Sequence, residues 1–113
     1  MRQRKRPWVD TLLTQPPAFV LPDLTHLAGK TRDHFAQVRL EIGSGKGDYW
    51  IQMSAAQPDV LWIGIEKDTK VGAIAIKKAL ASVQPDQIFL LGDALTHLSH
   101  LHDGDVDVIH LNF

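Results

Sequence analysis

Three carboxylate residues follow apolar stretches of the sequence, at places where a ligand could be bound. Glu41 stands two residues before a glycine-rich run, Gly43-Ser-Gly-Lys-Gly47, and Glu66 and Asp93 each come just after a later apolar run. Glycines allow a tight turn and a close approach of the backbone to a ligand. The N-terminus of a helix that follows such a turn offers free N–H groups. The predicted ligand-binding residues are Glu41, Gly43, Gly45, Glu66 and Asp93.

Two nucleotide-binding motifs fit this glycine run poorly. A P-loop requires G-x-x-x-x-G-K-[ST], but Leu40 and Gly47 occupy two of the required positions, so Lys46 is expected to be a solvated loop residue. A dinucleotide-binding unit requires G-x-G-x-x-G with an acid about 20 residues later; Glu66 fits, but the third glycine comes one place early. A carboxylate at Glu41 would also repel a pyrophosphate. A non-catalytic α/β nucleotide-binding or interaction domain, such as an NAD-binding Rossmann unit, remains the alternative.

S-adenosylmethionine suits the three acids better than a dinucleotide does. Its amino group and sulfonium carry positive charge and tolerate an acid such as Glu41 nearby. Its ribose diol can donate hydrogen bonds to Glu66, and its adenine amine can donate one to Asp93. We therefore expect S-adenosyl-L-methionine to be the cofactor.

Strand and helix patterns alternate from residue 38 onward. This alternation predicts an α/β fold, a Rossmann-like parallel sheet with crossover helices, in which the strand ends bring the acids to one edge. Trp50 and Trp62 fall in the apolar patterns and are expected in the core, while Ile76, Ala79, Leu80 and Val83 should form the buried face of the second helix of this region. The expected strands are 38–42, 60–65, 87–91 and 106–113, and the expected helices are 48–57, 69–83 and 94–101.

The first 37 residues differ in composition from the rest. They hold four of the six prolines, and residues 1–39 contain seven Lys or Arg against three acids, whereas residues 40–113 contain five against ten. We predict a basic N-terminal arm over 1–37, with a short helix between residues 8 and 14, and a ligand-binding domain over 38–113. The net charge of −1 averages these two parts, so it does not describe either of them.

Composition excludes several classes of protein. The chain has 113 residues, 44% of them apolar, and no cysteine, which rules out disulfide scaffolds and thiolate metal sites and favours a cytoplasmic location. No apolar run approaches the roughly 18 residues of a membrane span, so no membrane partner is expected. His97, His100 and His102 are interpreted as a polar helix end, and no metal is predicted.

Four segments and the first eight residues resemble one enzyme family. They are Leu40-Glu-Ile-Gly-Ser-Gly-Lys-Gly47, Trp62-Ile-Gly-Ile-Glu66, Leu91-Gly-Asp-Ala94, Val106-Asp-Val-Ile-His-Leu-Asn-Phe113 and Met1-Arg-Gln-Arg-Lys-Arg-Pro-Trp8. Together they resemble the bacterial tRNA (guanine-N7-)-methyltransferases, which are class I methyltransferases that form 7-methylguanosine. The resemblance runs from the first residue to the last.

The resemblance implies a function. It implies methyl transfer from S-adenosylmethionine to N7 of a tRNA guanine, at position 46 of the variable loop. Glu41, Glu66 and Asp93 would bind the cofactor, and Gly43 and Gly45 would line its methionine side. A homodimer is an arrangement that the sequence leaves open.

The basic arm has two interpretations. It combines cations with Trp8, as an arm that contacts phosphates would, although a solvated tail has the same composition. The resemblance favours contact with tRNA, and the expected RNA-binding residues are Arg2, Arg4, Lys5 and Arg6.

The family pattern continues beyond Phe113, into a segment similar to Asp-Pro-Trp-Pro-Lys-Lys-Arg-His. We therefore expect the chain to be the first half of a methyltransferase domain, with a sheet truncated after its fourth strand. No catalytic residue is expected in this segment, and the chain alone is expected to be inactive.

Overall fold

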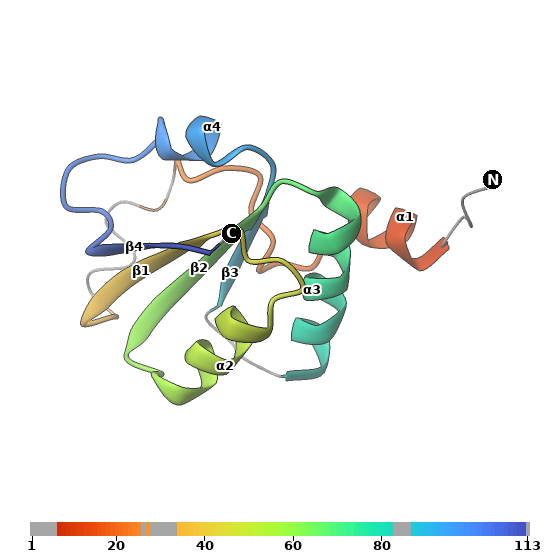
Figure 1. Cartoon of the computed structure of the whole chain (residues 1–113), viewed down its shortest axis with the longest axis horizontal. Helices are drawn as coiled ribbons and strands as arrows, with labels where there is room; N and C mark the ends of the chain where they lie inside the picture. The colour runs from red at the N-terminus through yellow and green to blue at the C-terminus, as the bar shows by residue number, and fades with distance from the viewer. Residues whose placement is uncertain (1–6, 26, 28–33, 83–86, 113) are drawn as a thin grey trace.

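The computed structural model describes residues 7–25, 27, 34–82 and 87–112 (Figure 1). Helices and strands alternate from residue 37 onward, as the sequence predicts. In chain order the elements are α1 (Pro7–Thr14), β1 (Gln37–Ile42), α2 (Asp48–Ala56), β2 (Val60–Glu66), α3 (Thr69–Ser82), β3 (Ile88–Leu91), α4 (Ala94–Leu98) and β4 (Val108–Leu111).

The four strands form one parallel sheet in the order β3-β2-β1-β4. This confirms the predicted α/β fold with parallel strands and crossover helices. Because the strands are parallel, the ends of β1, β2 and β3 lie side by side at one edge of the sheet. The glycine turn after β1 and the acids Glu66 and Asp93 therefore share that edge.

Two predicted elements are shorter than expected. The strand predicted over 106–113 covers Val108–Leu111, and the helix predicted over 94–101 ends at Leu98. Beyond α4 the chain tightens into turns in which the N–H groups of His100 and Leu101 bond to carbonyl oxygens three residues earlier. Such bonds close a helix end and prevent its continuation.

Both faces of the sheet are covered (Figure 1). On one face, α4 and residues 21–25 and 27 cover an aliphatic layer that includes Leu40, Ile63 and Leu90. On the other face, α2 and α3 cover an aromatic layer. Along β2 and β3, residues alternate between the two layers, as the pleat requires.

The aromatic layer confirms the prediction that Trp50 and Trp62 are core residues. They are 0% and 1% exposed, and the Trp50 indole N–H donates to the Trp62 carbonyl oxygen at 2.9 Å. The Trp50 and Phe89 ring centroids lie 4.8 Å apart. The indole hydrogen bond satisfies the one polar atom of Trp50, so α2 is held at a defined place on the sheet.

Helix α3 buries a different set of residues from the one predicted. Leu80 was expected on the buried face but is 51% exposed. The helix instead lies close to the sheet because its contact face is made of small residues; a Cβ on Gly72 would clash with the side chain of Leu91. Val83 lies outside the described residues. The buried residues of α3 are Gly72, Ala73, Ala75, Ile76 and Ala79.

Part of the segment predicted as an arm packs against the domain. Val20 forms a parallel bridge with Phe89, and Leu24 and Leu27 are buried in the aliphatic layer. Helix α1 contacts α3, where the Lys77 ammonium lies 4.4 Å from the Trp8 ring centroid. The division of the chain at residue 37 stays a prediction. The basic residues Arg2, Arg4, Lys5 and Arg6 lie outside the described residues.

Candidate functional site

The glycine turn between β1 and α2 is fixed against both neighbouring strands. The N–H groups of Gly43 and Ser44 donate to the Ile65 carbonyl oxygen at 2.9 and 3.0 Å. Gly43 has a φ of +81°, and a Cβ at this position would clash with the carbonyl oxygen of Asn112. Only glycine combines this backbone conformation with so close an approach of the chain.

Glu66, the last residue of β2, is held by two backbone N–H groups. The N–H of Gly45 donates to Oε1 and the N–H of Asp68 donates to Oε2, both at 2.9 Å. A carboxylate offers about four acceptor positions, so each oxygen keeps capacity for another donor. The half-buried Glu66 carboxylate is thus oriented by the protein and able to accept two hydroxyl groups.

Glu41 is 0% exposed, although it is an acid near the end of β1. Its Oε2 accepts a hydrogen bond from the Asn112 side chain at 3.3 Å, and its Oε1 has no hydrogen-bond partner. No ion pair with Glu41 occurs among the described residues. A buried polar oxygen without a partner is costly, and a cation or hydrogen-bond donor from a ligand would remove that cost.

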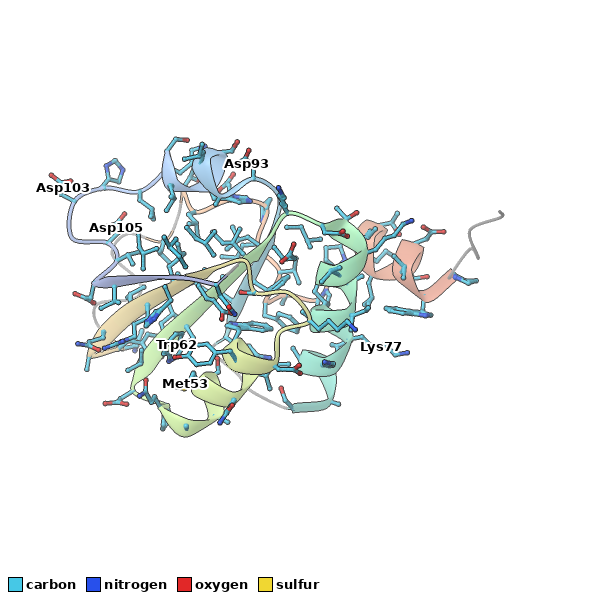
Figure 2. The ribbon with its side chains drawn as sticks, in the orientation of Figure 1. Met53, Trp62, Lys77, Asp93, Asp103 and Asp105 are labelled. Carbon is cyan, nitrogen blue, oxygen red and sulfur yellow. The ribbon has the colours of Figure 1, made fainter. Side chains whose placement is uncertain are left out.

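Asp93 stands at the end of β3 and caps α4. Its Oδ1 accepts the Leu95 N–H at 2.8 Å, while the side chain stays exposed. Figure 2 shows it at the turn between β3 and α4. The N–H of Gly92 donates to the Glu66 carbonyl oxygen at 3.0 Å, which ties this turn to the end of β2.

The structure therefore brings the predicted site residues to one edge of the sheet. Direct hydrogen bonds join Gly45 to Glu66, and the backbones of Gly43 and Gly92 bond to the end of β2. The arrangement presents one buried acid, one oriented acid and one exposed acid along three adjacent strand ends. These acids can bind a ligand that carries a positive charge, a diol and a further hydrogen-bond donor.

Several residues at this edge were missed by sequence analysis. Asn112 contacts Glu41 from the end of β4, and the buried Ser44 hydroxyl donates to the Glu41 carbonyl oxygen at 3.3 Å. Asp68 caps α3 by accepting the N–H groups of Lys70 and Val71. Only the Asp68 cap had a local signal, because an aspartate just before an apolar helical pattern is a common N-cap.

Two expectations about single residues have different outcomes. Lys46 is exposed, as predicted for a loop lysine. His97 lies in the last turn of α4, so its placement at a helix end is confirmed, but its side chain is only 5% exposed, and its Nε2 lies 2.9 Å from the Leu91 carbonyl oxygen. This contact anchors the last turn of α4 to the end of β3. In the described part of the chain, no three His, Asp or Glu side chains form a group able to hold a metal ion.

No helix within the described ranges is long and apolar enough to span a membrane.

Solved structures share the fold. The antibiotic-resistance methyltransferase Kmr matches with a TM-score of 0.60 and 21% identity, over 74% of this chain and 44% of that one. An RNA methyltransferase from Salinibacter ruber, solved in complex with S-adenosyl-L-homocysteine, matches with a TM-score of 0.54 and 23% identity, over 97% of this chain and 60% of that one. These similarities show that the chain shares the Rossmann-like fold of these two methyltransferases.

Curated relatives match over the whole chain. A tRNA (guanine-N(7)-)-methyltransferase of Limosilactobacillus reuteri (strain DSM 20016) is 35% identical over 116 residues, which cover 100% of this chain and 54% of the relative. The corresponding protein of Streptococcus pyogenes serotype M1 is 34% identical over 116 residues, covering 100% and 55%. The chain thus spans about half the length of the curated relatives it matches.

A family model with the description "Putative methyltransferase" matches residues 36–113, which include every strand of the sheet and all three acids. The match favours the methyltransferase interpretation over the dinucleotide-binding alternative. Because the match covers more than half of the sequence, the chain belongs to this methyltransferase family.

Proposed function

We propose that the protein transfers a methyl group from S-adenosyl-L-methionine to N7 of a guanine in tRNA and so forms 7-methylguanosine. The observation that carries the proposal is the similarity of the whole chain, at 32 to 35% identity, to tRNA (guanine-N(7)-)-methyltransferases. By the family resemblance, the guanine is that at position 46 of the variable loop. The partner is tRNA.

The strand-end acids fit this cofactor. The unpaired, buried Oε1 of Glu41 suits its ammonium group, and the oriented Glu66 carboxylate suits its ribose diol. The exposed Asp93 is placed for the adenine amine. Since Glu41 is wholly buried, an ammonium group would reach Oε1 after a local movement of the surrounding loop residues.

Bound S-adenosylmethionine would supply a methyl group on a sulfonium, and the neutral thioether S-adenosylhomocysteine would be the leaving group. Guanine N7 has an in-plane lone pair and no proton, so it would accept the methyl group directly, and the electron pair of the broken carbon–sulfur bond would stay on sulfur. No base has to remove a proton first. The protein then contributes by holding N7 and the methyl carbon in attack geometry. Carboxylates near the reacting groups would also stabilise the positive charge passed to the base.

Methyl transfer to tRNA tests this proposal. A purified form of the protein that spans the full length of its curated relatives is incubated with S-adenosylmethionine labelled in its methyl group and with unmodified tRNA, and the digested nucleosides are separated. We expect label in 7-methylguanosine and none when the tRNA contains 7-deazaguanine, which replaces N7 by carbon. Label on a ribose, or on another ring position of guanine, would contradict the proposed reaction.

We also propose that the basic arm contacts tRNA phosphates. Replacing Arg4, Lys5 and Arg6 with glutamine should weaken tRNA binding, because each cation that neutralises a phosphate releases a counterion. The slope of log K against log salt should flatten by about two units. Filter binding over a salt series measures this slope. An unchanged slope would mean that the arm is a solvated tail.

A further inference from the structure

We propose that Asn112 is a positioning residue that orients the Glu41 carboxylate toward the amino group of S-adenosylmethionine. The inference rests on the proposed function and deepens it, because it concerns how one end of the cofactor is recognised. Asn112 follows β4, and its place beside Glu41 results from the pairing of β4 with β1.

The two oxygens of Glu41 are in different situations. Oε2 accepts the Asn112 amide N–H at 3.3 Å, whereas Oε1 is buried without a partner. A hydrogen bond to one oxygen fixes the rotation of the carboxylate and so determines where the other oxygen lies. Since the amide is neutral, it leaves the negative charge of Glu41 uncompensated. A lysine or arginine in its place would neutralise that charge before a ligand cation arrived.

The backbone of Asn112 is itself held in place. Its N–H donates to the Ile42 carbonyl oxygen at 2.9 Å, and its carbonyl oxygen occupies the space that a Cβ on Gly43 would need. The short side chain therefore starts from a fixed point beside the glycine turn. Its only side-chain hydrogen bond among the described residues is the one to Glu41, so a change of this side chain should act on the cofactor through Glu41.

Two ligands separate this role from a general structural one. S-adenosylhomocysteine carries the amino-acid end of the cofactor, and 5′-methylthioadenosine lacks it. In calorimetric titrations of the purified protein, we expect Asn112→Ala to lower the affinity for S-adenosylhomocysteine about tenfold, the effect of losing one hydrogen bond to a charged group. Asn112→Asp should lower it further, because two carboxylates would then face each other. Affinity for 5′-methylthioadenosine should stay within about twofold.

A double-mutant cycle tests whether the effect passes through Glu41. In a Glu41→Gln background, Asn112→Ala should cause no further loss of S-adenosylhomocysteine affinity, because the two changes remove the same interaction. Asp107→Asn is the matched control. Asp107 lies just before β4 and accepts the Val38 N–H at 2.8 Å, so it tests a polar contact between the same two strands away from the site. This variant should bind both ligands as the unchanged protein does.

Equal losses for both ligands in the Asn112 variants, or additive losses in the cycle, would overturn the inference. An unchanged affinity for S-adenosylhomocysteine would overturn it as well. If Asn112→Ala fails to fold, the affinities of the nearly isosteric Asn112→Asp variant for the two ligands test the inference instead. If the unchanged protein binds neither ligand, the proposed function fails and the inference fails with it, whereas normal binding with unaffected Asn112 variants contradicts the inference alone.

Discussion

Replacing Glu66 with alanine is expected to lower the affinity for S-adenosylhomocysteine about 100-fold, because two hydrogen bonds from ribose hydroxyls to a charged acceptor are lost. The carboxylate is held ready for them by the N–H groups of Gly45 and Asp68, each at 2.9 Å. The carboxylate is already oriented before the ligand binds, so no binding free energy is spent on ordering it. Replacing Glu66 with alanine therefore removes the full contribution of this acceptor. Calorimetric titration of the purified variant measures the loss.

Asp48→Asn is the control for this loss, because it also removes one negative charge near the glycine turn. Asp48 is highly exposed and pairs with Lys78 at 2.8 Å, on a surface where such pairs contribute little. The affinity of the Asp48→Asn variant for S-adenosylhomocysteine should stay within about twofold of that of the unsubstituted protein. If Asp48→Asn reduced binding as much as Glu66→Ala, general electrostatics rather than a ribose contact would explain both results.

Replacing Gly43 with alanine is expected to lower the free energy of unfolding by about 3 kcal/mol. Part of the cost is the positive φ of +81°, which alanine adopts with strain. The larger part is the clash of the new Cβ with the carbonyl oxygen of Asn112, which would push the end of β4 away from β1. Urea denaturation followed by the fluorescence of the buried Trp50 and Trp62 measures the change.

Gly45→Ala in the same turn is the matched control. Gly45 also has a positive φ, +58°, but no atom lies within 4 Å of the place that a Cβ would take. Only the backbone term remains, so the expected loss is about 1 kcal/mol. Equal losses for the two variants would show that the close approach of β4 to the glycine turn does not contribute to stability.

The edge that holds the acids was predictable from the sequence because it depends on local patterns. A strand directly followed by Glu66, and a glycine turn that follows the strand containing Glu41, need only alternation and spacing to be recognised. In a parallel sheet all such ends meet at one edge, so the grouping with Asp93 follows from the fold class. The confirmed sheet topology supports that step.

The contact between Glu41 and Asn112 could not be predicted in this way. The two residues are 71 positions apart, and they meet because β4 pairs with β1 rather than with β3. Alternation of strands and helices does not determine this order. His97 is a similar case, since its burial depends on the Leu91 carbonyl oxygen beneath α4 and not on its place in a polar stretch. Periodicity placed Leu80 on the buried face of α3, but it could not show that the residues of α3 that contact the sheet are mostly small ones and do not include Leu80.

A crystal structure of the protein with S-adenosylhomocysteine tests the central claim most directly, namely that the three strand-end acids hold the cofactor. We predict that the ribose hydroxyls lie within hydrogen-bond distance of Glu66, the amino group near Oε1 of Glu41 and the adenine amine near Asp93. A ligand bound elsewhere, or bound at this edge with its ribose turned away from Glu66, would contradict the claim.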